Sequence, residues 1–237
     1  MADFLTAYLK WVAPIEGGYG WFVNDSGGET YAGIARNYNP TWVGWPIIDN
    51  IKKTRYAGKP LIAPDNVTPI KNNTKFTELD AAVATFYQDL WNAGKFGQIK
   101  VQQLADILFD WSVNSGGLAV RTQPKETYGI DEILIEKFGQ NIPVDSKFDQ
   151  TTIDAINRVN ADQLYAEIKK ARTDYYNWLY QQNPAKYGQF IQGWLNRING
   201  FPAAKVVAIG GGVLILVSVG LYLYYRSHHE HRLKLAA

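Results

Sequence analysis

The chain has 237 residues, 46% of them apolar and 19% charged, which is enough apolar sequence for a large folded core. Its formal net charge of +2 is too small to indicate a nucleic-acid partner, and none is expected. Cysteine is absent and the three histidines, His228, His229 and His231, lie near the C-terminus, so residues 1–204 hold no thiol nucleophile, disulfide, catalytic histidine or histidine-ligated zinc.

The N-terminal third of the chain predicts one helix, a small hairpin and an irregular segment. Apolar residues recur at helical spacing over residues 3–15, and Gly17-Gly18 ends this helix. Over residues 19–34, apolar and polar residues alternate irregularly, with turn residues at Asn24-Asp25 and Gly27-Gly28. This pattern predicts a small hairpin or loop. Residues 37–75 are rich in Asn, Pro and Lys, and we expect irregular surface structure flanking a cleft.

The rest of the body reads as a series of helices. A capping-box-like start at Thr77–Asp80 opens a helix that continues to Trp91, and a second runs from Val101 to Trp111 and closes at residues 114–117. Further helices are expected at residues 117–127, 130–138, 149–159, 162–182 and 185–198. The predicted fold class is therefore mainly α with a minor β element.

Residues 206–225 form an uncharged apolar segment long enough to cross a bilayer as a helix. Lys205 and Arg226 bracket it, which favours a transmembrane helix over the alternative of a buried core helix. We expect a lipid membrane to be a partner through residues 206–225. The tail that follows is basic, and its histidine cluster is expected to be solvated, with metal binding as the alternative.

The densest run of candidate catalytic residues lies between residues 16 and 34. Glu16 ends the first helix on its apolar side, where a desolvated carboxyl stays protonated, as a general acid requires. Asp25, Glu29 and Thr30 follow in a glycine-rich stretch and are candidates to hold a water or brace the reacting centre. The alternative is a helix cap with a surface-exposed Glu16 and an ordinary glycine-rich hairpin.

These motifs resemble a known family. The stretch from Glu16-Gly17-Gly18-Tyr19 to Asn24–Ile34 is similar to the opening motif of the glycoside hydrolase family 108 N-acetylmuramidases, a phage-type lysozyme group. Residues 86–91, 108–116 and 190–197 resemble the peptidoglycan-binding half of those proteins. The resemblance implies a lysozyme-like helical fold with a hairpin near the active site. It also implies cleavage of the bond between N-acetylmuramic acid and N-acetylglucosamine, with peptidoglycan as partner and no cofactor or metal.

On this resemblance, the chain divides into a catalytic half over residues 1–100, a helical peptidoglycan-binding-like half of the same globule over 101–202, a transmembrane helix over 203–226 and a basic tail over 227–237. Glu16 falls on the family's catalytic acid, Asp25 on the Asp before the Gly-Gly pair and Thr30 on the Thr after it. Glu29 stands where the family usually has a small residue, so the second carboxylate stays open between Asp25 and Glu29.

Aromatic and polar residues around this motif are candidates for substrate binding. Flat rings present an apolar face to sugar C–H groups. Asp110 and Asn114 lie four apart on one predicted helix and either bind substrate or form a buried hydrogen-bonded pair shaping the turn at Gly116-Gly117. The expected substrate-binding residues are Tyr19, Tyr31, Trp42, Trp45, Asp110 and Asn114.

Taken together, the sequence predicts a membrane-anchored muramidase that degrades bacterial cell walls. An enzyme followed by a C-terminal anchor, without a secretory leader over residues 1–14, is typical of a bacteriophage lysis protein or of a virion enzyme, and the second is preferred. The expected location is a virion membrane or the host cell envelope. The alternatives are a non-catalytic peptidoglycan-binding or scaffold protein on a lysozyme fold, and a lytic transglycosylase.

Overall fold

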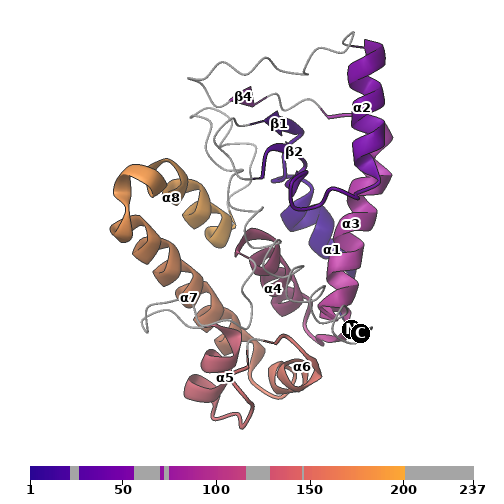
Figure 1. Cartoon of the computed structure of the whole chain (residues 1–237). Coiled ribbons are helices and arrows are strands. Elements are labelled where there is room, and N and C mark those ends of the chain that lie inside the picture. Colours follow the sequence, from indigo (N-terminus) through magenta and orange to yellow (C-terminus); the bar gives the residue numbers. More distant parts are fainter. Residues whose placement is uncertain (22–26, 56–69, 72–74, 116–128, 146, 201–237) are drawn as a thin grey trace, which may run out of the picture.

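The computed structural model describes residues 1–21, 27–55, 70–71, 75–115, 129–145 and 147–200 (Figure 1). The helix expected at residues 117–127, the turn at Gly116-Gly117, the apolar segment 206–225 and the tail 227–237 lie outside these ranges. Within them, no helix has both the length and the hydropathy needed to cross a bilayer.

The first predicted helix is confirmed and ends at Val12, four residues before Glu16. It comprises α1 (Phe4–Ala7) and the π-helix η1 (Tyr8–Val12). The carboxylate of Asp3 accepts a hydrogen bond from the Thr6 backbone N–H at 2.7 Å and so caps the first turn. At the other end the Val12 carbonyl accepts from the Glu16 N–H at 2.8 Å, which holds Glu16 against the last turn.

A small antiparallel sheet follows where the sequence predicted a small hairpin or loop, and it contains more strands than a single hairpin. Its strands are β1 (Tyr19–Trp21), β2 (Glu29–Tyr31), β3 (Ile34–Ala35) and β4 (Ile70–Lys71), in the order β3-β2-β1-β4. Ala32 and Gly33, with φ of 46° and 77°, form the two-residue turn between β2 and β3. Positive φ at both positions is typical of a type I′ turn, whose twist matches paired strands.

The segment 37–75 is not irregular throughout, which corrects the sequence prediction. Residues 44–55 form the helix α2 (Gly44–Arg55), with Trp45, Ile48 and Ile51 buried along one side. Pro46 reads as a helix breaker, but it lies in the first turn, where the backbone N–H has no intrahelical partner to lose. Trp45 therefore lies on the buried side of a helix and not in a loop.

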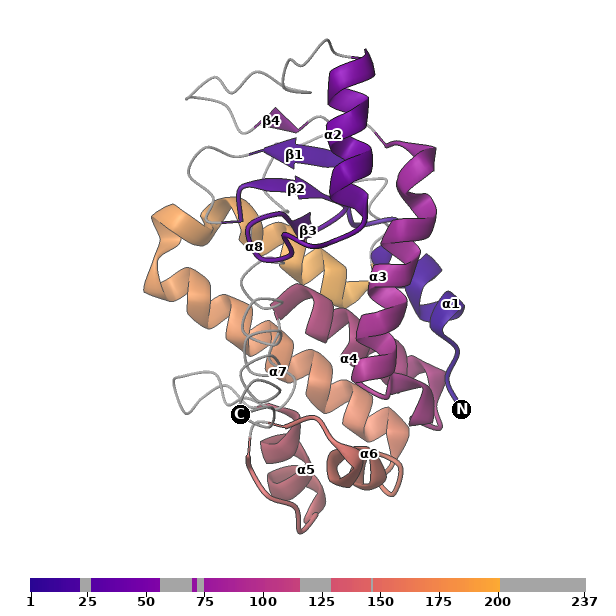
Figure 2. The same cartoon turned by 45° about the vertical axis from the view of Figure 1, so that its right-hand side comes forward.

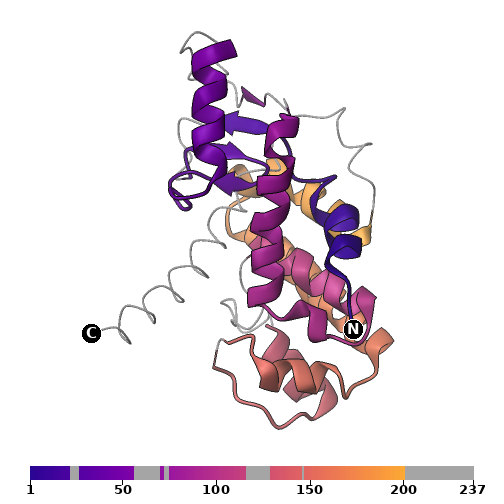
Figure 3. The ribbon, with the colours of Figure 1, turned by 90° about the vertical axis from the view of Figure 1, so that its right-hand side faces the viewer.

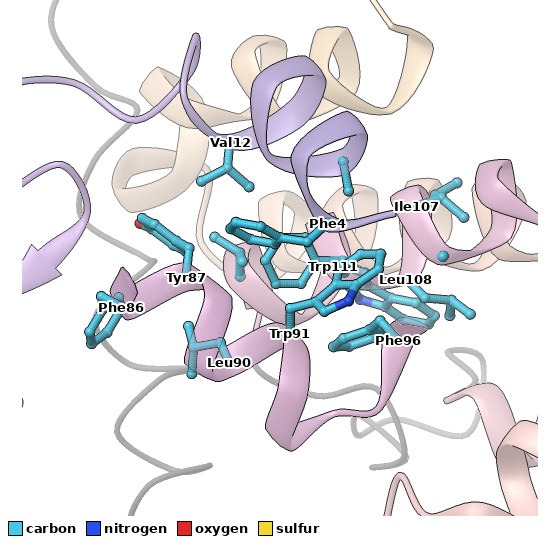
Figure 4. Packing of buried hydrophobic residues seen from close by; sticks show 14 of the residues in the cluster. Phe4, Val12, Phe86, Tyr87, Leu90, Trp91, Phe96, Ile107, Leu108 and Trp111 are labelled. Atoms are coloured by element: carbon cyan, nitrogen blue, oxygen red, sulfur yellow. The ribbon is translucent and has the colours of Figure 1, made fainter. Parts of the chain in front are cut away.

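Helices η2 (Thr77–Leu79), α3 (Asp80–Ala93), η3 (Phe96–Gln98) and α4 (Gln102–Ser115) build the centre of the molecule. The helices predicted from Thr77 and from Val101 are confirmed. The predicted capping box is not: α3 begins after Leu79 without a side-chain cap. Figure 4 shows the rings of Phe4, Trp91 and Phe96 gathering where α1, α3 and α4 meet.

The C-terminal half contains α5 (Ile130–Phe138), α6 (Gln150–Ile156), α7 (Ala161–Gln182) and α8 (Pro184–Asn199), all predicted from the sequence. Pro184 occupies the first turn of α8, where Asn183 caps the helix. The three views agree that the sheet and the α5–α6 pair lie at opposite ends of the molecule, and that α7 and α8 form a hairpin (Figures 1, 2 and 3). This hairpin returns the C-terminal end of α8 to the N-terminal half.

The aromatic cluster at the helix junction provides a test of the core. Trp91 is buried, with ring centroids 6.0 Å from Phe4 and 5.6 Å from Phe96. We expect Trp91→Ala to lower the free energy of unfolding by about 3–5 kcal/mol, because it leaves a large cavity. Urea unfolding followed by far-UV circular dichroism measures this. Leu5→Ala, at a residue 57% exposed on α1, is the control and should change it by less than about 0.5 kcal/mol.

Candidate functional site

Glu16 is a buried carboxyl group at the edge of a cavity. It is only 4% exposed, although it lies between the end of η1 and the start of β1. The cavity has a volume of about 430 Å³, and residues from η1, the β2–β3 turn and α3 line it. Leu9, Val12 and Val83 supply an apolar wall, and Tyr31, Lys75, Asp80 and Tyr87 supply polar groups. A cavity of this size and mixed lining suits a small polar ligand with apolar faces.

The β2–β3 turn approaches the carboxyl group closely. A Cβ atom placed on Gly33 would lie 2.6 Å from Glu16 Oε2 and 2.8 Å from the Tyr87 hydroxyl oxygen. The Tyr87 hydroxyl donates to the Ala32 carbonyl at 2.7 Å, which fixes the turn to α3. Only glycine fits here, because the position needs both positive φ and the absence of a side chain.

A buried network of charges holds the other side of Glu16. Arg197, on α8, donates from Nη1 and from Nη2 to Glu16 Oε1, each at 3.2 Å. Its Nε donates to Asp110 Oδ1 at 2.7 Å, and Arg172 Nη2 donates to Asp110 Oδ2 at 2.8 Å. All four side chains are at most 4% exposed. Two carboxyl groups therefore face two guanidinium groups inside the protein.

Opposing influences set the acidity of Glu16. Burial raises its pKa, because the charged carboxylate loses its hydration. The Arg197 guanidinium opposes this increase through its charge and hydrogen bonds, and the negative charge of Asp110 adds to it. Burial prevails and the pKa of Glu16 lies above its usual range, so its carboxyl group holds a proton more readily than that of an exposed glutamate.

The candidates for the second carboxylate are placed differently. Asp25 lies outside the described residues. Glu29 is on β2, where Arg36 Nη1 donates to its Oε2 at 2.7 Å and Lys52 from α2 contacts its Oε1. Both oxygens of Glu29 are therefore in ion pairs, and Glu29 does not line the cavity described above. Thr30 is buried, and its hydroxyl donates to the Gly28 carbonyl at 3.2 Å.

Of the aromatic candidates, the structure brings only Tyr31 to the cavity. Its hydroxyl is tied to the backbone of Phe76, accepting from the N–H at 2.8 Å. Tyr19 is buried on β1, and burial raises the pKa of its hydroxyl. Trp42 and Trp45 are 7% and 1% exposed, and their rings pack edge to face with centroids 5.0 Å apart. In this structure both tryptophans belong to the core and neither lines the cavity.

Asp110 and Asn114 are both buried, but each forms its hydrogen bonds with other helices, which differs from the buried pair given above as the alternative to substrate binding. Asp110 accepts from two arginines, and Asn114 accepts from the Tyr176 hydroxyl of α7. They join α4 to α7 and α8. The turn at Gly116-Gly117 that they were expected to shape lies outside the described residues.

Several residues of the site were not predicted from the sequence. Arg197 was noted only as part of a family-like segment, and Tyr8, Lys75 and Asp80 were not considered for the cavity. Asp80 could have been predicted from the sequence. It lies at the start of the helix that directly follows residues 37–75, the segment expected to flank a cleft. Among the residues that the structure describes, no group of three or more His, Asp or Glu side chains is arranged to hold a metal.

Two family models match the chain. Glycosyl hydrolase 108 matches residues 9–116, and Predicted Peptidoglycan domain matches residues 130–199. No curated protein matches. The chain therefore carries a glycosyl hydrolase 108 domain followed by a predicted peptidoglycan-binding domain. Glu16 falls in the first match and Arg197 in the second. Residues 86–91 and 108–116, both assigned above to the peptidoglycan-binding half, fall in the first match, which corrects that assignment.

The contact between the turn and Glu16 gives a direct test of the site. We expect Gly33→Ala to reduce peptidoglycan-degrading activity at least 10-fold, because the new methyl group displaces the carboxyl of Glu16. Gly139→Ala is the matched control, since Gly139 has a similar φ of 63° with nothing within 4 Å of its Cβ position. It bears the same backbone strain of about 1–2 kcal/mol and should stay active. Equal activity in the two variants would contradict the close approach.

Proposed function

We propose that the protein is an N-acetylmuramidase, which hydrolyses the bond between N-acetylmuramic acid and N-acetylglucosamine in peptidoglycan. The observation that carries the proposal is a buried carboxyl group of raised pKa, Glu16, at the edge of a cavity in a glycosyl hydrolase 108 domain. The peptidoglycan-binding domain that follows supports the same polymer as substrate. Two carboxyl groups suffice for glycoside hydrolysis.

In the proposed reaction Glu16 acts as general acid. It donates its proton to the oxygen that bridges the two sugars, and the bond from that oxygen to the anomeric carbon breaks through an oxocarbenium-like transition state. Water adds its hydroxyl to the anomeric carbon, and its remaining proton passes to a carboxylate. The apolar wall of Leu9, Val12 and Val83 limits hydration of Glu16 and keeps the proton available.

We propose Asp25 as the second carboxylate. The resemblance aligns Asp25 with the family's Asp, while the ion pairs of Glu29 with Arg36 and Lys52 leave Glu29 poorly suited to accept a proton from water. Asp80 is the other carboxyl group that lines the cavity in the described part of the chain. We assign it a place in the wall that contacts the sugar chain.

The location of the protein is a further part of the proposal. We propose that residues 206–225 anchor the enzyme in a membrane, and that a bacteriophage particle carries it for penetration of the cell wall. The uncharged apolar sequence of this segment supports the anchor. Mass spectrometry of purified particles is the test: the chain should be found there, and its presence only in lysed host membranes would favour a lysis protein.

Removal of the acid is the first test of the reaction. Glu16→Gln keeps the shape of the side chain but holds no proton to donate, so we expect release of reducing ends from purified peptidoglycan to fall by about 100-fold or more. Glu136→Gln, at an exposed position on α5, is the control and should match the wild-type protein. Mass spectrometry of the products also separates the alternatives. A lytic transglycosylase gives anhydro-sugars lighter by one water, and a scaffold protein gives no product.

A second comparison tests the assignment of the other carboxylate. Asp25→Asn should lower activity by about 100-fold, whereas Glu29→Gln should stay within a few-fold of wild type and lower the melting temperature, because Lys52 and Arg36 lose a charged partner. Reducing-end assays and thermal unfolding measure both. The reverse pattern would move the role to Glu29, and a loss confined to Asp80→Asn would move it to Asp80.

A further inference from the structure

The catalytic carboxyl group receives a partner from the other end of the chain. Arg197 lies 181 residues after Glu16, in the peptidoglycan-binding match and outside the glycosyl hydrolase 108 match. Its side chain is 4% exposed, and its guanidinium donates twice to Glu16 Oε1. The helix that carries it, α8, returns to the N-terminal half through the α7–α8 hairpin (Figure 2).

We propose that Arg197, held in place by Asp110, is a positioning residue that orients the carboxyl group of Glu16, so that the peptidoglycan-binding domain completes the active site of the hydrolase domain. This inference rests on the proposed role of Glu16 as general acid. It assigns to the second domain a part in the reaction in addition to any binding of the polymer.

The geometry assigns the two oxygens of Glu16 different parts. Oε1 accepts two N–H groups of a planar guanidinium, which is rigid and always charged. A proton on Oε1 would be forced against these donors, so the acidic proton resides on Oε2. That oxygen faces the backbone of Gly33 on the side of the cavity-lining turn. Arg197 thereby fixes which oxygen delivers the proton.

Asp110 limits how strongly Arg197 acts on Glu16. The contact between Arg197 Nε and Asp110 Oδ1 is 2.7 Å, shorter than the 3.2 Å contacts to Glu16. Arg172 holds the other oxygen of Asp110 and so fixes its orientation. Because Asp110 shares the positive charge of Arg197, Glu16 can bear a proton beside a guanidinium. Without Asp110, Arg197 would favour ionised Glu16.

Groups from every neighbouring element bear on this balance. Arg197 comes from α8, Asp110 from α4 and the Tyr87 hydroxyl from α3, while Lys75 and Asp80 line the same cavity. Arg197 lowers the pKa of Glu16, and Asp110, which carries the opposite charge, raises it. Their removal should therefore shift the pH dependence in opposite directions.

The test is the pH profile of kcat/KM on purified peptidoglycan, measured on the full chain. The alkaline limb reports loss of the proton from the general acid. In Arg197→Met the carboxylate loses a cationic partner, so the limb should move to higher pH by about one unit, and the maximum should fall by about 10- to 100-fold because the carboxyl is no longer oriented. In Asp110→Asn the limb should move to lower pH.

Arg197→Lys separates charge from geometry. Lysine retains the positive charge but not the fork of N–H donors, so the limb should stay near its wild-type position while the maximum falls. Trp91→Ala is the control for destabilisation, because it weakens the core without touching Glu16, and its limb should not move. Circular dichroism identifies variants that fold. If Arg197→Met does not fold, Asp110→Asn still tests the direction of the shift, and Arg197→Lys tests the loss of orientation through the fall of its maximum.

The outcomes separate the two proposals. Limbs at the wild-type pH in Arg197→Met and Asp110→Asn, with Glu16→Gln inactive, would show that Arg197 only stabilises the fold, and the inference would be wrong. Shifts of the limb in the same direction in both variants would also overturn it. Full activity of Glu16→Gln would instead refute the proposed acid, independently of Arg197.

Discussion

The structure depends on one buried contact, between the carboxyl group of Glu16 and the guanidinium of Arg197. Charged groups without water are destabilising unless each has a partner of good geometry. Here the partners form a chain from Glu16 through Arg197 and Asp110 to Arg172. Glu16 and Asp110 come from the N-terminal segment and α4, whereas Arg172 and Arg197 come from α7 and α8, so the network can form only when α7 and α8 are docked on the N-terminal half.

This constraint links the fold to the chemistry. The end of η1 positions Glu16. The turn at Gly33 lies against Oε2 of its carboxyl group, and Arg197 donates to Oε1. The apolar wall of the cavity raises the pKa of the carboxyl, and the guanidinium restrains that increase. A general acid that works near neutral pH needs a pKa set between these two effects. A carboxyl group in a fully apolar site would hold its proton too tightly, and one fully paired with a guanidinium would lose it.

Much of the fold was predictable, because periodic apolar residues mark helices such as α3, α4, α7 and α8 directly. The helix α2 was missed because Pro46 and the polar residues of 37–75 conceal its buried side, and Trp45 was consequently assigned to a loop. Glu16 was found from its place at the end of an apolar helix and from its motif. Arg197 was not, since a pairing across 181 residues leaves no local pattern.

The account is tested most directly by a crystal structure of the Glu16→Gln variant with a bound peptidoglycan oligosaccharide. We predict sugar density in the cavity lined by Tyr31 and Val83, with the bridging oxygen within about 3.2 Å of the residue-16 side chain and Arg197 still contacting that side chain from the opposite side. An oligosaccharide bound elsewhere, or one whose bridging oxygen lies beyond hydrogen-bond reach of residue 16, would contradict the role given to Glu16.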